Sequence, residues 1–298
     1  MEKIFGKKSS VFFTFLTGFI RIRGVVNWFV ISFFGFLLGI SSLDITSYMV
    51  PLIFFVVSTF FILAFTFAIN NYYDIDTDKA NPRRADLNAM ASGNISKQTG
   101  LLLNLIFIVI PLVLSLFFTI EVFVFCAFLL FWMWMYSAPP LRLKGRAGLD
   151  ILWHFIAFLG LVLWGSYLAG SVSMINILVA VSFGIFGCFA QIDNHIHDYP
   201  FDKASGSKTF VVWIGIDKAY MALKLSFILY IFFLIPLIVL FSFSSYLTIL
   251  IICGGIVVSL FIIKIKKSSL APSLFYVINF FGGSVYVSCL IYHISNML

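Results

Sequence analysis

The sequence predicts an all-α polytopic membrane protein, with nine transmembrane helices in two related four-helix halves plus a ninth helix. Composition is the first reason, because 62% of the 298 residues are hydrophobic and only 10% are charged. In soluble domains, about 45–50% of the residues are hydrophobic and about 25% are charged. The second reason is that nine apolar segments are long enough to cross the roughly 30 Å hydrocarbon core. The third is the pattern Asn-x-x-x-Asp-x-x-x-Asp, which occurs twice, each time where an apolar segment ends.

Charge placement supports the count of nine spans. The spans are predicted near residues 25–41, 48–70, 98–117, 120–137, 150–170, 173–191, 219–240, 245–263 and 271–295. This count puts all 19 Lys and Arg residues on one side of the membrane and leaves only Asp44 and Glu121 on the other. Because cytoplasmic loops carry the excess of Lys and Arg, we expect a cytoplasmic N-terminus and an external C-terminus.

The chain is predicted to form a single transmembrane domain over residues 1–298, with pseudo-repeat halves at about 25–149 and 150–270 and a ninth helix at about 271–295. The two acidic motifs follow spans two and six, one four-span period apart. Related halves with a site between them are a recurring membrane design. The net charge of +7 indicates membrane orientation and contact with membrane lipids. No basic run predicts nucleic-acid binding, and no obligate protein partner is evident.

The two motifs point to a metal site. They consist of Asn70, Asp74 and Asp78, and of Asn194, Asp198 and Asp202. A spacing of four turns a helix by about 40° per step, so each trio is expected along one helical stripe. Oxygen ligands suit hard divalent cations, above all Mg²⁺, which links carboxylates to substrate phosphates. The motifs therefore predict an intramembrane enzyme that handles a diphosphate, with its active site on the cytoplasmic side.

Three polar stretches follow the spans on that side. The stretches 71–97 and 192–218 each begin in an acidic motif, and we expect them to form short helices and lids over the site. The third is Tyr-Ser-Ala-Pro-Pro-Leu-Arg-Leu-Lys at 136–144. Its two prolines should end the preceding helix and present Arg142 and Lys144 at the membrane surface.

With these motifs, the chain resembles the UbiA superfamily of intramembrane prenyltransferases over nearly its whole length. The matching stretches are Asn-Asn-Tyr-Tyr-Asp-Ile-Asp-Thr-Asp at 70–78, Asn-Pro-Arg-Arg at 81–84, Met-Ala-Ser-Gly at 90–93, the proline turn at 136–144, the second motif, and Gly-Ser-Lys-Thr at 206–209. The resemblance implies a helical bundle that encloses a large cavity, with a lateral portal to the bilayer. It also implies two Mg²⁺ ions, one per motif, that hold a prenyl diphosphate.

Carried over by position, the first trio would bind one ion and the second trio the other, while Arg84, Lys203 and Lys208 would contact the diphosphate. The chain departs from the family pattern at Asn71, where most members have Asp, at Gly24, where proline is common, and at His195 and His197. These departures leave the acceptor open: an aromatic quinone precursor, a carotenoid, a porphyrin derivative or a glycerol lipid.

The candidate residues divide by role. Candidate catalytic residues are Asp74, Asp198, Lys203 and Tyr136; candidate substrate-binding residues are Asn27, Tyr72, Arg84, Arg142, Lys144 and Lys208. Lys203 would help neutralise the departing diphosphate, and the Tyr72 and Tyr136 rings could stabilise a carbocation. Asn27 either faces the cavity or makes an interhelical hydrogen bond. Asp150 is expected to cap a helix.

Other function classes fit the motifs less well. A CDP-alcohol phosphotransferase needs Asp-Gly and Ala-Arg ahead of its spaced aspartates, and the chain has no such sequence. A membrane transporter with a cytoplasmic-side divalent-cation site would have ionisable groups near mid-membrane. The carboxylates instead lie at helix ends. A carotenoid-specific or glycerol-lipid-specific member of the same family stays open.

Overall fold

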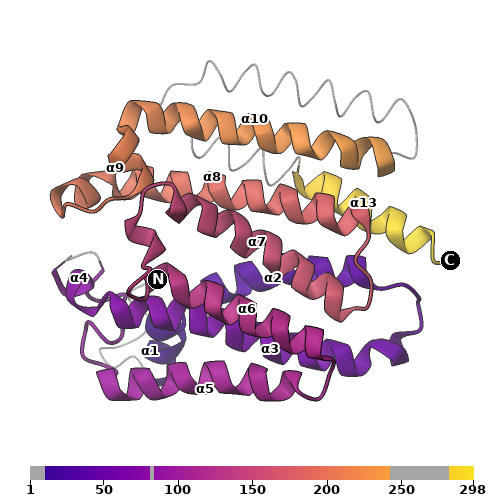
Figure 1. Cartoon of the computed structure of the whole chain (residues 1–298), viewed down its shortest axis with the longest axis horizontal. Coiled ribbons are helices and arrows are strands. Elements are labelled where there is room, and N and C mark those ends of the chain that lie inside the picture. The colour runs from indigo at the N-terminus through magenta and orange to yellow at the C-terminus, as the bar shows by residue number, and fades with distance from the viewer. Residues whose placement is uncertain (1–10, 81–83, 242–281) are drawn as a thin grey trace, which may run out of the picture. The chain divides into compact units, whose positions relative to one another are not determined.

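The computed structural model describes residues 11–80, 84–241 and 282–298, and these residues form helices and connecting turns (Figure 1). Seven helices in this part of the chain are long and apolar enough to span a membrane. They are α2 (Ile22–Gly39), α3 (Ile45–Tyr73), α5 (Lys97–Ser115), α6 (Ile120–Ser137), α7 (Leu149–Leu168), α8 (Met174–Ala204) and α10 (Ile216–Phe241). They confirm the first seven predicted spans.

The shorter elements are α1 (Val11–Thr14), η1 (Phe15–Phe19), α4 (Ile75–Ala80), η2 (Leu143–Gly145), α9 (Phe210–Ile214) and α13 (Gly283–Ser295). The predicted eighth span, 245–263, lies outside the described residues, and so does the first part of the predicted ninth span. Of the ninth span, α13 is the described part. The count of nine spans stays a prediction.

Local chemistry sets where several helices begin and end. The side chain of Ser96 accepts the Thr99 N–H at the start of α5, and Thr119 accepts the Val122 N–H at the start of α6. Both are N-caps that satisfy a backbone donor with no partner inside the helix. At its other end α6 stops at Ser137, and Ala138 is extended because it precedes a proline. The predicted proline stop is confirmed.

The described residues separate into two compact units. One lies within residues 1–32 and 49–143, and the other within 33–48 and 144–298. The chain passes from one unit to the other inside α2 and again inside α3. The predicted halves, 25–149 and 150–270, assign residues 33–48 differently, and the relation of these halves as repeats stays a prediction.

In the first unit, α3 is the most buried long helix, and α5 packs against α6. Aromatic side chains fill the spaces between the helices: Phe54 of α3 stacks on Phe118, with ring centroids 4.2 Å apart, and Phe61 contacts Phe107 of α5. The polar end of α3 carries the first acidic motif. Packing along the apolar part of α3 therefore fixes where that motif emerges.

In the second unit, α8 packs against both α7 and α10, and these three helices run side by side in Figure 1. Glycine residues allow α7 and α8 to approach each other closely. A Cβ atom on Gly187 of α8 would lie 2.8 Å from the backbone carbonyl oxygen of His154 in α7. A Cβ atom on Gly184 would lie 2.8 Å from the Phe155 ring. Small residues at such crossings are typical of helix packing in membranes.

We expect Gly187→Ala to destabilise the second unit, because the added methyl group must push α7 and α8 apart. Overpacking of this kind costs about 1–3 kcal/mol. Thermal unfolding in detergent would show a lower midpoint. The matched control is Gly145→Ala, since a Cβ atom there has no neighbour within 4 Å. Equal midpoints for the two variants would contradict this account of the α7–α8 contact.

Candidate active site

The first acidic motif lies at the end of α3 and in α4. Asp74 interrupts the helix, yet its N–H donates to the Asn70 carbonyl oxygen at 3.1 Å, and the Asp78 N–H donates to the Asp74 carbonyl oxygen at 2.7 Å. These bonds keep the helical spacing across the interruption. The trio therefore lies along one stripe, as the sequence predicts, although the helix itself extends beyond residue 70 and breaks at Asp74.

Each side chain of this trio has a polar partner within the unit. Asn70 Oδ1 accepts a hydrogen bond from Ser137 at 2.9 Å, at the end of α6. Asp74 Oδ1 lies 3.6 Å from the Arg142 guanidinium. This contact places the predicted proline turn beside the first motif, with Arg142 facing its central carboxylate.

The third member, Asp78, is the most buried acid of the trio, with 3% of its surface exposed. Its Oδ2 accepts a hydrogen bond from Asn88 Nδ2 at 2.9 Å. Burial raises the pKa of the Asp78 carboxyl, and the negative charge of Asp74 raises it further. The Asn88 hydrogen bond and the positive charges of Arg21 and Arg84 act in the opposite direction.

A buried amide network holds this region together. Asn71 and Asn88 are fully buried. Asn71 Nδ2 donates to the carbonyl oxygens of Gly18 at 3.0 Å and Phe19 at 2.8 Å, and Asn71 Oδ1 accepts from Arg21. Asn88 Nδ2 also reaches the Asn71 carbonyl oxygen at 2.8 Å. A carboxylate at position 71 would have no N–H to donate, which explains the departure from the family pattern here.

The sequence reasoning missed Asn88 and counted Arg21 only as a topological charge. Arg21 adopts a φ of 50° at the start of α2, and burial lowers the pKa of its guanidinium. Its electrostatic neighbours include Asp74, Asp78, Arg84 and Tyr136. Two of the predicted site residues, Arg84 and Tyr136, are therefore near the first motif. No spacing pattern marks Asn88, because its contacts depend on how the polar stretch folds back.

Tyr72, a predicted substrate-binding residue, has surroundings of its own, and its role stays a prediction. It lines a pocket of ≈ 620 Å³ with Tyr73, Asp76 and Lys79, and Lys97 Nζ lies 5.5 Å from the centre of its ring. A residue two positions from Asp74 is turned by about 200° on a helix, so it faces a different side.

Asn27 is exposed on α2 and makes no hydrogen bond to another described residue. The predicted interhelical hydrogen bond of Asn27 is therefore not formed within the described part of the chain.

The second motif lies wholly in α8. The predicted membrane span ends near residue 191, and the helix itself continues through Pro200 to Ala204. Its polar end carries Asn194, which is exposed, and Asp198 and Asp202, which are half-buried. The spacing of four in a continuous helix places the trio on one stripe. Of the short helices expected after this motif, the structure has only α9 within the described residues of that stretch.

Behind this stripe, α8 carries buried polar residues. His195 Nδ1 lies 3.4 Å from Asp150 Oδ2, and His195 Nε2 lies 2.6 Å from Gln191 Nε2. His197 is exposed and faces Asp193, with Nδ1 3.6 Å from Oδ1. The two histidines therefore face different acids, as expected for residues two positions apart on one helix.

The turn after α8 is tied to the motif. Thr209 Oγ1 donates to Asp202 Oδ2 at 3.3 Å, and the Phe210 N–H donates to Asp150 Oδ2 at 2.8 Å. Asp150 also accepts the Gly148 and Ile151 N–H groups, so its predicted role as a cap at the start of α7 is supported.

The remaining predicted cations have other surroundings. Lys203 lies 5.6 Å from the centre of the Tyr199 ring, and Lys208 is exposed. Lys144 is half-buried in η2, in the second unit, whereas Arg142 belongs to the first. Arg142, Arg84 and Arg21 are cations that contact the first motif or act on it electrostatically.

The donor set of each motif fits Mg²⁺. Within the described residues, no group of three or more His, Cys, Asp or Glu side chains forms a closed metal site. Each motif instead offers two carboxylates and one amide oxygen. Mg²⁺ is usually held by one or two carboxylates together with waters and substrate phosphates. The trios therefore suit a metal whose coordination is completed by waters or by a phosphate ligand.

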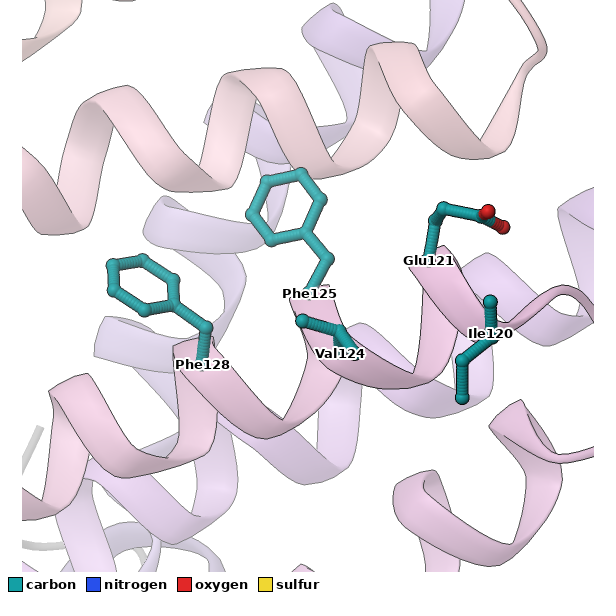
Figure 2. A pocket seen from close by; sticks show the side chains of 5 residues that line it. All are labelled: Ile120, Glu121, Val124, Phe125 and Phe128. Atoms are coloured by element: carbon teal, nitrogen blue, oxygen red, sulfur yellow. The ribbon is translucent and has the colours of Figure 1, made fainter.

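A separate apolar depression of ≈ 440 Å³ lies along α6. Its lining side chains all come from that helix and are labelled in Figure 2: Ile120, Glu121, Val124, Phe125 and Phe128. Glu121 is 16 residues from Ser137, which contacts Asn70, and this is roughly 24 Å at 1.5 Å per residue. The depression is therefore remote from the first acidic motif, which is at the other end of α6.

The fold is shared with solved membrane proteins. A UbiA homologue from Archaeoglobus fulgidus bound to DMAPP and Mg²⁺ has a TM-score of 0.71 at 19% identity, covering 95% of this chain and 99% of that one. The structure of a digeranylgeranylglyceryl phosphate synthase has a TM-score of 0.73 at 18% identity, covering 96% and 99%. A UbiA homologue from Aeropyrum pernix K1 has a TM-score of 0.69 at 17% identity, covering 93% and 99%. At these identities the likeness establishes the fold.

Among curated proteins, a lycopene elongase/hydratase of Corynebacterium glutamicum is 28% identical over 184 residues. The aligned region is 57% of this chain and 60% of that protein, so the chain spans about three-fifths of the relative's length. Residues 28–284 match the UbiA prenyltransferase family. Since this match runs from α2 into α13 and includes both acidic trios, the chain belongs to the UbiA prenyltransferase family, whose members are integral membrane enzymes that transfer prenyl groups.

Proposed function

We propose that this enzyme moves a prenyl group from a prenyl diphosphate to a hydrophobic acceptor, with release of pyrophosphate, and that it requires Mg²⁺ bound at each acidic motif. The observation that carries the proposal is the first motif, where Asn70, Asp74 and Asp78 line one stripe and Arg142 lies 3.6 Å from Asp74. Hard oxygen ligands next to a guanidinium are suited to a metal-bound diphosphate.

Prenyl transfer breaks the bond between the allylic carbon and the diphosphate oxygen, joins that carbon to the acceptor, and removes a proton from the acceptor. Bound Mg²⁺ would neutralise the charge that develops on the departing diphosphate. Arg142 and Arg84 would hold phosphate oxygens, since a guanidinium offers paired donors in a fixed plane. The Tyr136 ring would stabilise the allylic cation through its face.

An aromatic stripe on α6 suits the prenyl chain. Phe125, Phe128 and Trp132 follow one another at spacings of three and four, and the Phe128 and Trp132 rings stack with centroids 6.0 Å apart. Tyr136 continues the stripe at the end of the helix that carries Ser137. We assign the diphosphate to that end and the hydrocarbon chain to the stripe beyond it, where water is excluded.

The acceptor is expected to be a lipid or isoprenoid. The lycopene elongase/hydratase relative favours a polyene such as a carotenoid, while an aromatic quinone precursor and a glycerol lipid stay alternatives. For the topology, we propose nine spans with the N-terminus and the site in the cytoplasm, because this arrangement puts all 19 Lys and Arg residues on one side.

The direct test is pyrophosphate release by the purified chain, supplied with Mg²⁺ and prenyl diphosphates of several lengths. Carotenoid, aromatic and glycerol-lipid acceptors would be compared. We expect release that depends on one acceptor class, and complete loss with EDTA that added Mg²⁺ restores. Recovery with Zn²⁺ alone would favour the histidines as ligands and contradict the Mg²⁺ assignment. Absence of both release and diphosphate binding would contradict the proposed function.

A further inference from the structure

We propose that Asp150 is a positioning residue for the second acidic motif: it anchors the start of α9, and through Thr209 it fixes the carboxylate of Asp202. This inference rests on the proposed function, in which Asp198 and Asp202 bind Mg²⁺. Asp150 belongs to neither acidic motif and is fully buried at the start of α7.

The two oxygens of Asp150 have different partners. Oδ1 accepts the N–H groups of Gly148 at 2.8 Å and Ile151 at 2.9 Å, both in its own turn of the chain. These two bonds fix the orientation of the carboxylate. Oδ2 is thereby directed to partners outside α7, which a helix cap alone would not require.

The first outside partner is α9. Asp150 Oδ2 accepts the N–H of Phe210, the first residue of that helix, at 2.8 Å. The residue just before it, Thr209, is buried and donates its hydroxyl to Asp202 Oδ2 at 3.3 Å. A carboxylate that binds a metal through one oxygen is oriented by a hydrogen bond to the other. Asp150 therefore holds the segment that orients Asp202.

The second outside partner is α8 itself. His195 Nδ1 lies 3.4 Å from Asp150 Oδ2, and the other ring nitrogen of His195 lies 2.6 Å from Gln191 Nε2. His195 follows Asn194 directly and precedes Asp198 by three residues. The contact with Asp150 thus lies on the buried side of α8, while Asn194 is exposed and Asp198 is half-buried.

The variant Asp150→Asn separates positioning from capping. Its amide can keep one oxygen for the N–H groups of Gly148 and Ile151, but it then directs an NH₂ group at the Phe210 N–H, donor against donor. If the amide turns over instead, α9 stays anchored and the α7 turn loses its acceptor. The matched control is Asp217→Asn, which changes an exposed acid in the first turn of α10.

The experiment measures Mn²⁺ binding to the full-length chain in detergent by the EPR signal of free Mn²⁺, in an Asp74→Asn background that leaves the second motif as the site. We expect Asp150→Asn to weaken binding about 10–100-fold, the usual loss when a group that orients a metal ligand is removed. Deuterium uptake by the segment 205–214 should rise. Asp217→Asn should change neither quantity.

If Asp150→Asn does not fold, Thr209→Val tests the link from α9 to the motif, because it keeps the side-chain shape and removes the hydroxyl that reaches Asp202. Thr209→Ser should restore Mn²⁺ binding. The positioning role would be overturned if Asp150→Asn or Thr209→Val, introduced into the background protein, changed neither its Mn²⁺ binding nor its deuterium uptake. Absence of Mn²⁺ binding in the wild-type chain would instead overturn the proposed metal function, while deuterium uptake would still decide whether Asp150 anchors α9.

Discussion

Asp74→Asn and Asp198→Asn are each expected to reduce acceptor-dependent pyrophosphate release by about 10²–10³-fold, because each removes a negative charge from a trio that would hold Mg²⁺ against the diphosphate. Asp74 and Asp198 are the central members of their trios and lie on polar helix ends. Their replacement should leave the helical packing intact, so the thermal unfolding midpoint in detergent should match that of the wild-type chain.

Asp76→Asn is the matched control for Asp74→Asn. Asp76 lies two residues further along the chain, is exposed, and faces the pocket that contains Tyr72 and Lys79. Its replacement removes the same charge from the same short segment and should leave turnover unchanged. A loss of activity shared equally by Asp76→Asn and Asp74→Asn would indicate a general charge effect, and full activity of Asp74→Asn would contradict a metal at the first motif.

Asn71→Leu is expected to lower the free energy of unfolding by about 3 kcal/mol, because it removes the hydrogen bonds that Asn71 makes to the buried Arg21 guanidinium and to two buried carbonyl groups. Asn71 is fully buried and serves Arg21, Gly18 and Phe19 at once. Thermal unfolding in detergent, monitored by circular dichroism, would measure the shift in midpoint.

Asn71→Asp refines this test. It keeps an acceptor for Arg21 but loses both N–H donors to the carbonyl oxygens, so we expect a smaller loss of stability than for Asn71→Leu. Asn94→Leu is the matched control, since Asn94 is an exposed asparagine of the same polar stretch whose side chain donates to the nearby Ser92. A midpoint for Asn71→Leu as high as that of Asn94→Leu would show that the buried network does not stabilise the unit.

The positions of the helices followed from hydrophobicity, because each span must bury its backbone polar groups within its own hydrogen bonds. Six of the seven described spans end within a few residues of the predicted positions. The exception is α8, which continues to Ala204. Its extension carries Asp193, His195 and His197 and lacks the apolar run that marks a span, so hydropathy could not show it. The buried contact of His195 with Asp150, at the start of α7, helps to hold this polar extension.

The site was predictable in part. The sequence by itself determined a multi-pass helical membrane protein and both acidic trios, because apolar length and a spacing of four are local properties of the chain. Only the tertiary structure decided which residues support these trios: Asn88 at Asp78, Arg142 at Asp74, and Thr209 with Asp150 at Asp202. These are contacts between polar groups distant along the chain. They form where folding excludes water, which no local pattern specifies.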